Sequence, residues 1–249
     1  MDILKHKQFG DTVTSYDALK ALALLLMFVD HIGVFFFPDE PLFRVLGRLC
    51  VPLWFFLIGY ADSRHIPKSW LVWGLILAAG IMAFEGRVFP LNIIATMIIC
   101  RLLLDILTPY ATGGLGPFAV VTLAAAILSF YTVPLIEYGA LAVPLAMLGL
   151  AMRRGGATVW HGIIVYAAFF VPQTYTQGFT PFYALLFAAL LPLSFLICWY
   201  FKPVRWNGPP AILRFPLQLM GRRTLEIYVL HLLVFLFIVS PYFGAVFYR

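Results

Sequence analysis

The sequence predicts an all-α membrane protein, a polytopic transmembrane helical bundle of about nine spans (eight to ten) with a cytoplasmic N-terminus. The 249-residue chain is 63% hydrophobic and only 11% charged, and its mean hydropathy is +0.95. A soluble domain carries about 25% charged residues. Several of the apolar runs that recur along the chain are long enough to cross a bilayer as helices. We therefore expect residues 1–249 to form a single integral-membrane domain.

The distribution of positive charge predicts the orientation. A net charge of +6 would suggest a nucleic-acid partner in a soluble chain. Here the positive residues lie between apolar runs, so membrane topology explains them better and no nucleic-acid partner is expected. With the N-terminus inside, eleven Lys and Arg residues fall in inner segments and two in outer segments, and four lie within spans. This asymmetry predicts that the N-terminus is cytoplasmic and the C-terminus is outside.

The first four spans are separated by polar or turn-forming segments. Ser15 can cap the first helix, which ends at the acidic Pro-Asp-Glu-Pro turn of residues 38–41. This run is too long for a cleavable signal peptide, and we expect it to remain as the first transmembrane helix. In the fourth span, Arg101 and Asp105 are four residues apart and are expected to be able to pair on one face. The four spans are expected at about 15–37, 42–63, 69–85 and 91–107.

The later spans begin after the Gly/Pro-rich segment ATGGLGP. An uncharged polar loop, VPQTYTQGFTP, precedes the eighth span, and a basic, Pro-rich loop follows it. A short amphipathic piece at about 211–220 is expected at the membrane interface. The later spans are expected at about 117–131, 135–152, 157–171, 181–201 and 223–240.

Three common catalytic, metal-binding and phosphate-binding motifs are absent from the sequence. There is no G-x-S-x-G elbow, no H-E-x-x-H helix and no Gly-rich phosphate loop. Two histidines and a carboxylate could in principle hold zinc, but no ligand spacing supports this and no metal is expected. Cys50, Cys100 and Cys198 fall inside apolar runs without metal-type spacing, so we interpret them as small core residues.

The first span carries four ionisable residues in an otherwise apolar run, namely Asp17, Lys20, Asp30 and His31. Such groups are unfavourable at membrane depth and commonly face protein or a water-filled cavity. Helix geometry returns His31 to within ~20° of the face of Lys20, ~16 Å further along. Asp30 lies ~100° around the helix from His31 and is not expected to be its partner. Structural alternatives are a snorkelling Lys20 and a His31 bonded to a backbone carbonyl.

Further polar residues lie in the second, fourth and last spans. Arg48 cannot deprotonate, so it needs a carboxylate, a phosphate or a polar cavity. Its structural partner could be Asp17, Asp30 or Glu226. His231 could be a satisfied core histidine, and the pair Arg222–Arg223 could simply set topology. Because these groups recur on several spans, we expect one polar cavity in the bundle, with Asp17, Asn92, Glu226 and His231 as candidate substrate-cavity residues.

Three segments of the sequence resemble a known family. The segments SYDALKALALLLMFVDHIG, GRLCVPLWFFLIGYA and TLEIYVLHLLVF are similar to the TraX family. That family belongs to the wider transmembrane acyltransferase group, alongside the acyltransferase-3 enzymes. The resemblance is clearest over residues 15–63, is fainter around Asn92, and returns at 221–235. It implies transfer of an acyl group, typically acetyl from acetyl-CoA, in the bacterial cytoplasmic membrane.

The family also implies acceptors. The protein that gives the family its name acetylates the N-terminus of F-pilin, and the wider group modifies sugars and cell-envelope glycans. The resemblance therefore implies an acceptor protein or glycan that offers an amine or a hydroxyl, in addition to the acyl-CoA donor and the lipid bilayer.

The family motifs fall on particular residues. The basic residue and histidine of the wider group fall on Lys20 and His31, and the Asp-His pair of the family falls on Asp30 and His31. The histidine of the final helix falls on His231. Lys20 stands where many acyltransferase-3 proteins have Arg, so the charge is kept but the bidentate fork is lost. The Gly-Arg and Pro-Leu element falls on Gly47, Arg48, Pro52 and Leu53.

The resemblance and the residues together suggest roles. His31 would deprotonate the acceptor, and Arg48 or Lys20 would stabilise negative charge on the thioester carbonyl. Asp30 completes the catalytic candidates. The candidates for binding the anionic acyl-CoA are Lys20, Arg48, Arg153, Arg154, Arg222 and Arg223, with Arg64 and Lys68 also at the expected inner face.

Two other functions fit the same residues. In a transporter or flippase, Asp30, His31 and Arg48 would relay protons or bind an ion. A scaffold in pilus or envelope assembly would tolerate the loss of His31. The three functions differ in whether an acyl-CoA thioester is consumed.

Overall fold

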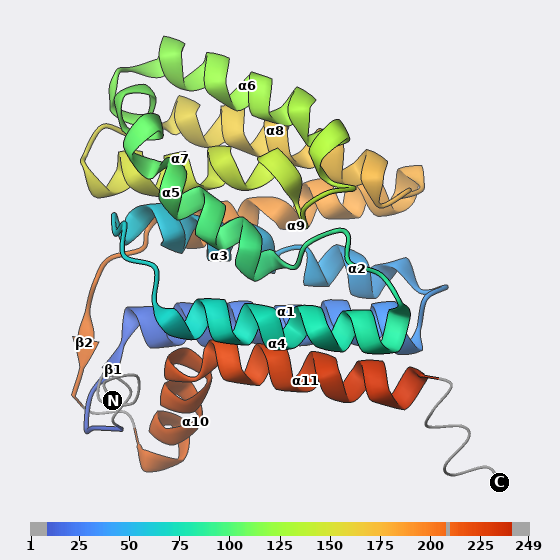
Figure 1. The fold of residues 1–249 in the computed structure, drawn as a ribbon. Coiled ribbons are helices and arrows are strands. Elements are labelled where there is room, and N and C mark those ends of the chain that lie inside the picture. Colours follow the sequence, from blue (N-terminus) through green and yellow to red (C-terminus); the bar gives the residue numbers. More distant parts are fainter. Residues whose placement is uncertain (1–8, 208–209, 241–249) are drawn as a thin grey trace, which may run out of the picture.

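The computed structural model describes residues 9–207 and 210–240, and this part of the chain is predominantly helical (Figure 1). One short antiparallel strand pair, β1 (Val13–Thr14) with β2 (Arg205–Trp206), is seen in this part and ties the segment before the first helix to the loop before α10. The helices are α1 (Ser15–Phe36), α2 (Pro41–Gly47), α3 (Cys50–Tyr60), α4 (Lys68–Glu85), α5 (Ile93–Thr112), α6 (Leu115–Thr132), η2 (Gly139–Leu141), α7 (Ala142–Arg153), α8 (Val159–Thr176), α9 (Pro181–Trp199), α10 (Ala211–Arg222) and α11 (Thr224–Val239).

Six helical segments of the described chain are long and apolar enough to cross a membrane, by length and composition. Two further apolar segments, 139–153 and 224–239, are shorter. The remaining expected span, 157–171, corresponds to helix α8. The all-α fold is therefore confirmed and its apolar helices are consistent with a membrane protein, whereas the number of about nine spans and the cytoplasmic N-terminus stay predictions. The six segments are 15–36, 41–60, 68–85, 93–112, 115–132 and 181–199.

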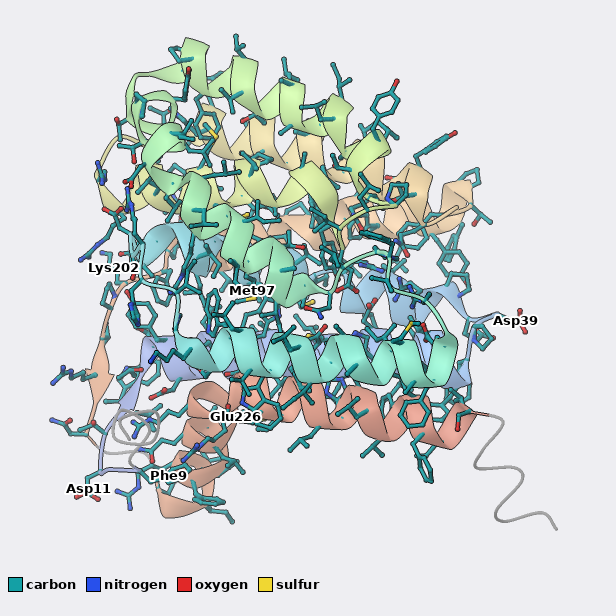
Figure 2. All side chains as sticks on the ribbon, viewed as in Figure 1. Phe9, Asp11, Asp39, Met97, Lys202 and Glu226 are labelled. Atoms are coloured by element: carbon teal, nitrogen blue, oxygen red, sulfur yellow. The ribbon has the colours of Figure 1, made fainter. Side chains whose placement is uncertain are left out.

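The helices form a bundle in which α11 packs against both α1 and α4 on one flank (Figure 1). Helices α6 and α8 pack together on the opposite flank, and α3, α5 and α7 lie between. Asp39, in the turn after α1, and Lys202, in the loop after α9, lie at opposite ends of the bundle (Figure 2). We call these the Asp39 end and the Lys202 end.

The centre of the bundle is the crossing of α3 and α7. Every residue of α3 is buried. Glycines bring the two backbones together: a Cβ on Gly59 would lie 1.8 Å from the Ala146 carbonyl oxygen, and one on Gly149 would lie 2.1 Å from that of Phe56. Small residues at such crossings let membrane helices pack by close van der Waals contact. The three cysteines are buried and free, which confirms their interpretation as core residues.

Two local predictions are wrong. The cap of α1 is Thr14, whose hydroxyl accepts from the Asp17 amide while the Asp17 carboxylate accepts from the Thr14 amide. Ser15 instead accepts from the Val204 amide, because the strand pair brings that loop alongside. The expected pair of Arg101 and Asp105 does not form, because tertiary partners replace it. Asp105 binds Arg64, and Arg101 donates to the His65 carbonyl.

The expected helix 42–63 is divided into α2 and α3 by a tight turn at Arg48 and Leu49. The amide of Leu49 donates to the Leu46 carbonyl, three residues back, which is the hydrogen bond of a tighter 3₁₀ turn. This turn places Arg48 where the polar site is formed.

Helix α10 lies across the direction of the other helices at the Lys202 end (Figure 1). Its Ile212, Leu213 and Phe215 are exposed, whereas Gln218 is buried and donates to the carbonyls of Gly10 and Thr12. A helix with an apolar outer face and a polar inner face suits the membrane interface. That location stays a prediction.

Candidate functional site

The site is built around two histidines that come from helices at opposite ends of the sequence. His31 of α1 and His231 of α11 are joined by a 2.7 Å contact between Nδ1 of His31 and Nε2 of His231. The Nδ1 of His231 lies 2.9 Å from the Ile227 carbonyl oxygen. A carbonyl oxygen can only accept, so Nδ1 of His231 carries a hydrogen.

This hydrogen-bond chain fixes the tautomers of the neutral pair. Because Nδ1 of His231 donates, its Nε2 bears a lone pair and accepts from Nδ1–H of His31. The Nε2 of His31 is then left with a lone pair of its own. The arrangement therefore presents His31 as a proton acceptor and His231 as the residue that orients it.

Aromatic side chains hold the two imidazoles in place. The ring of Phe28 stacks on His231 with centroids 4.1 Å apart, and Phe235 meets His231 edge-on at 5.5 Å. Tyr228 contacts both imidazoles, with centroid distances of 6.0 Å to His31 and 5.8 Å to His231. Packed on several sides, the rings have little freedom to rotate, which favours a preorganised site.

A second cluster, which we call the arginine cluster, consists of Asp30, Arg44, Arg48 and Gln177. Asp30 is buried and pairs with Arg44 at 2.7 Å, and its other oxygen lies 3.6 Å from Nε of Arg48. Gln177, at the end of α8, accepts from both Nε and Nη2 of Arg44, at 3.2 and 2.8 Å. Of the three carboxylates considered for Arg48, the structure thus selects Asp30, and Asp30 is not bonded to His31.

Glycine at position 47 lets the arginine cluster form. A Cβ at Gly47 would lie 2.2 Å from Cβ of Asp30, so any side chain there would push α2 away from α1. The close approach brings both arginines, one helical turn apart, within reach of a single carboxylate. Arg48 also lies over the ring of Tyr138 at 5.1 Å, which adds a cation–π contact.

The two clusters share a small cavity of about 170 Å³, which we call the small cavity. Its polar lining comes from both clusters and from the segment between α4 and α5. Arg87 in that segment is half exposed, which places the opening of the cavity beside α4's last turn. Among the lining residues are Asp30, His31, Arg44, Arg48, Glu85, Arg87, Asn92 and Glu137.

A larger cavity of about 790 Å³, the large cavity, lies along α1 toward Lys20. Its charged lining residues in the described chain are Lys20, Lys68 and Arg222, and exposed His65 stands beside them. Trp54, Trp70, Met27 and Met97 supply an apolar interior. This volume falls within the range of ligand pockets, and the lining is basic at one end and apolar deeper in.

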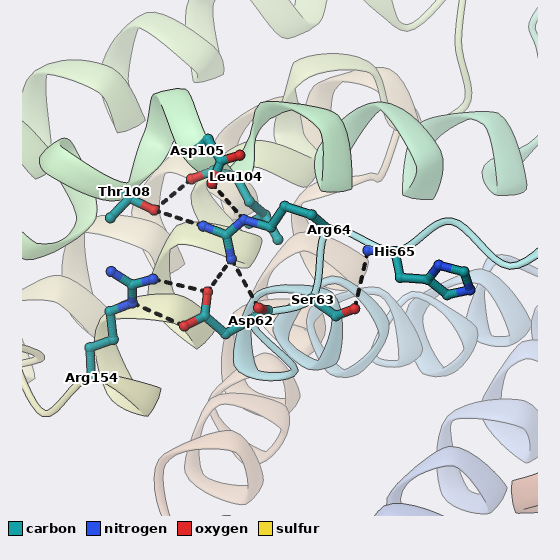
Figure 3. Close-up of polar contacts among 8 residues, drawn as sticks. All are labelled: Asp62, Ser63, Arg64, His65, Leu104, Asp105, Thr108 and Arg154. Atoms are coloured by element: carbon teal, nitrogen blue, oxygen red, sulfur yellow. Dashed lines mark hydrogen bonds and ion pairs between the residues drawn. The ribbon is translucent and has the colours of Figure 1, made fainter.

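An ion-pair network holds the loop that borders the large cavity (Figure 3). Asp62 receives two hydrogen bonds from Arg154, at 3.0 and 3.2 Å, and also binds Arg64. Arg64 in turn donates to Asp105 at 2.7 Å and to Thr108 at 3.2 Å. Burial acts to raise the pKa of the Asp62 carboxyl, but the hydrogen bonds from the two arginines outweigh it and lower that pKa. The network thus links α3, α5 and α7 next to His65 and Lys68.

The structure places the other predicted residues as follows. Asp17 is buried, caps α1 and pairs with Arg222 at 3.2 Å. Asn92 accepts from the Ile94 amide and donates to the Gly74 carbonyl, so it both caps α5 and lines the small cavity. Glu226 pairs with Arg223 at 3.5 Å, one turn from the start of α11.

The predicted acyl-CoA-binding residues separate into groups. Lys20 and Arg222 line the large cavity, as does Lys68. Arg48 belongs to the arginine cluster on the small cavity instead. Arg153 lies over the ring of Tyr60 at 5.7 Å, and Arg154 is held by Asp62. Their roles in binding an acyl donor stay predictions.

Sequence reasoning missed three residues of the site. Arg44 falls within the expected span 42–63, and its spacing of four from Arg48 places both on one face of a helix. Gln177 lies in an uncharged loop, and only the tertiary fold brings it to the arginines. Glu137 accepts from the Ile93 amide and lines the small cavity. Within the described residues, no group of three or more His, Cys, Asp or Glu side chains could hold a metal ion.

Comparison with known proteins places the chain in a family. The family model described as "TraX protein" matches residues 15–239. An uncharacterized protein of Rickettsia prowazekii (strain Madrid E) is 24% identical over 236 residues, which cover 90% of this chain and 92% of the relative. No solved structure matches the chain. The family match spans α1 to α11, and with them both histidines and the arginine cluster. The chain therefore belongs to the TraX family.

Proposed function

We propose that the protein is an integral-membrane acyltransferase that moves an acyl group, in the first instance acetyl, from acyl-CoA to an amine or hydroxyl acceptor. The observation that carries this proposal is the hydrogen-bonded chain from His31 through His231 to the Ile227 carbonyl. His31 lines the small polar cavity, which follows a large cavity that is basic at one end. Family membership is consistent with acetylation of a pilin, and an envelope glycan is the other candidate acceptor, implied by the resemblance to the wider acyltransferase group.

In the proposed reaction, His31 acts as general base. Its Nε2 takes the proton from the acceptor N–H or O–H as that atom attacks the thioester carbonyl carbon. The carbon–sulfur bond then breaks, and the thiolate of CoA leaves and takes the proton back from His31. His231 accepts from Nδ1–H throughout and keeps the ring of His31 oriented, as hydrogen-bond partners of functional imidazoles commonly do.

Two cavities supply the two substrates in this proposal. The phosphates of acyl-CoA suit the basic end of the large cavity, where Lys20, Lys68 and Arg222 gather. The acceptor suits the small cavity, where Arg48 lies beside His31 and would stabilise negative charge on the thioester oxygen. Asp30 keeps both arginines in position through its ion pairs.

The first test compares wild type with His31→Gln in lipid nanodiscs. Both are incubated with radiolabelled acetyl-CoA and three acceptors, namely a short peptide with a free N-terminus, an oligosaccharide and hydroxylamine. The uncatalysed reaction of each acceptor with acetyl-CoA is measured in empty nanodiscs and subtracted. We expect His31→Gln to bind acetyl-CoA normally and to lose about 10²- to 10⁴-fold in transfer rate, the usual contribution of a general base. Absence of both acetyl-CoA binding and thioester cleavage in the wild type would contradict the proposal and favour the transporter alternative.

A second test addresses the donor site. Lys68→Gln removes a charge that lines the large cavity, and Lys202→Gln removes an exposed charge at the same end that does not line it. We expect only Lys68→Gln to weaken acetyl-CoA binding, by about tenfold, because a charge-assisted hydrogen bond contributes roughly 1.5–3 kcal/mol. Equal dissociation constants for the two variants would place the donor elsewhere.

A further inference from the structure

Tyr228 is the residue that the two cavities have in common. Among the described residues, its side chain alone appears in the lining of both the large and the small cavity. It is 5% exposed, so the bundle holds it on all sides except those that face the cavities. Any passage between the two cavities along α11 therefore has to go past this ring.

Neighbouring residues on two helices confirm that Tyr228 lies at the boundary. On α11, Thr224 and Leu225 line the large cavity, whereas Leu232 and Leu236 line the small one. On α1, Lys20 and Met27 line the large cavity, and the small cavity begins three residues after Met27, at Asp30. The cavities thus follow each other along the bundle axis, and Tyr228 stands at their junction.

The ring of Tyr228 also contacts the histidine pair. Its centroid lies 6.0 Å from that of His31 and 5.8 Å from that of His231. His31 itself lines the small cavity and does not appear in the lining of the large one. A group that enters by the large cavity therefore meets Tyr228 before it reaches His31.

We infer that the ring of Tyr228 is a partition between a donor cavity and an acceptor cavity. The chemical consequence rests on the proposed function. With the ring in place, water from the small cavity is kept away from a thioester in the large cavity, so acyl-CoA is not hydrolysed in the absence of acceptor. Removing the ring would join the cavities into one continuous channel.

The partition is tested by thiol labelling, which does not depend on enzymatic activity. Single cysteines replace Met97, in the large cavity, or Leu232, in the small cavity, and membrane vesicles are treated with a charged, impermeant maleimide on one side at a time. We expect M97C to react only from the side of the Lys202 end and L232C only from the side of the Asp39 end. Adding Tyr228→Ala should let each cysteine react from both sides, and Tyr228→Phe should restore the one-sided pattern.

Matched variants separate the partition from general loosening. Leu225→Ala enlarges only the large cavity and should leave the one-sided pattern of M97C unchanged. Because Leu232 carries a probe, Leu236→Ala serves as the control for the small cavity. Two-sided labelling in the wild-type background, or one-sided labelling in folded Tyr228→Ala, would overturn the inference.

A second readout distinguishes failure of the inference from failure of the proposed function. Tyr228→Ala is expected to cleave acetyl-CoA without acceptor at a rate raised on the order of tenfold, because water then reaches the thioester. Two-sided labelling that appears only with Tyr228→Ala, together with this cleavage, supports both the partition and the acyltransferase proposal. Two-sided labelling that appears only with Tyr228→Ala, with no acetyl-CoA cleavage in any variant, would support the partition and overturn the acyltransferase proposal.

Discussion

At the scale of single residues, the direction of one hydrogen bond decides which imidazole is available as a base. The Ile227 carbonyl oxygen fixes the hydrogen on Nδ1 of His231, and this in turn makes His31 the donor in the contact between the two rings. His231 is therefore expected to act through His31 rather than on the substrate. A scaffold protein would not need a fixed donor–acceptor order between the two imidazoles.

A pair of substitutions at His231 tests that order. The side-chain oxygen of His231→Gln can accept from Nδ1–H of His31, whereas His231→Phe removes the acceptor and retains an aromatic ring. We expect His231→Phe to lower the transfer rate by about 10²-fold, at the lower end of general-base contributions, and His231→Gln to recover much of this loss. Turnover rates at saturating acetyl-CoA provide the measurement, and equal rates in the two variants would argue against an orienting role.

The arginine cluster gives a stability prediction at the same scale. Asp30→Asn leaves two largely buried guanidinium groups without a carboxylate, and removing one partner of a buried ion pair costs about 3–5 kcal/mol. Combining it with Arg44→Met removes the partner at 2.7 Å as well, so the double variant should lose less than the sum of the single losses. Equilibrium unfolding in mixed detergent micelles measures these differences. Additive losses would show that the pair is not coupled.

At the scale of elements, two helix crossings determine the shape of the site. Gly47 brings α2 against α1 at Asp30, and Gly59 and Gly149 bring α3 against α7. Helix α3 follows α2 after the turn at Arg48, so its position sets the position of the arginine cluster. The close crossing in the bundle centre thus supports the polar groups at its edge.

Gly149→Ala tests the dependence on the α3–α7 crossing. The new methyl group would lie 2.1 Å from the Phe56 carbonyl oxygen, so the helices have to separate, and we expect a loss of about 1–3 kcal/mol or more from overpacking. Gly116→Ala is the matched control, since nothing lies within 4 Å of its Cβ on exposed α6. The control should be neutral or stabilising by about 0.5–1 kcal/mol, as is usual for Gly to Ala in a helix. Equal effects on thermal unfolding would contradict the close contact.

Hydropathy predicted the helices well, because a span needs a long apolar run and little else. The contacts within and between them were less predictable. The i, i+4 spacing suggested Arg101 with Asp105, yet Arg64 reaches Asp105 from another element. The sequence allows several carboxylate partners for Arg48, because the sequence of a helix does not determine how that helix is rotated against its neighbours. The cavities, and Tyr228 at their junction, exist only after all the helices have packed.

At the scale of the whole molecule, the two ends of the bundle differ in charge and in cavity. The large cavity and its cations lie toward Lys20 and the loop at 61–67, whereas the small cavity opens beside Arg87 near the end of α4. The sequence predicts that the Lys202 end faces the cytoplasm, where acyl-CoA is found. The cavity suited to acyl-CoA would then open on the side that holds it.

Cysteine labelling of the loops tests this orientation. Lys202→Cys and Asp39→Cys lie at opposite ends of the bundle, and the native cysteines are buried and should not react. In intact cells, an impermeant maleimide is expected to modify Asp39→Cys and to spare Lys202→Cys until the membrane is opened. The reverse pattern would mean that the N-terminus is outside.

The most direct test of the account is acetyl-CoA cleavage in sealed vesicles of known orientation. Radiolabelled acetyl-CoA is supplied on one side only, with hydroxylamine, which crosses membranes, as the acceptor, and wild type is compared with His31→Gln. Because hydroxylamine also cleaves thioesters without an enzyme, the rate in protein-free vesicles is subtracted from each measurement. We expect cleavage when the donor faces the Lys202 end, and loss of about 10²- to 10⁴-fold of that rate in His31→Gln. Cleavage that is equal from both sides, or that persists unchanged without His31, would contradict a transferase that takes its donor through the large cavity and uses His31 as base.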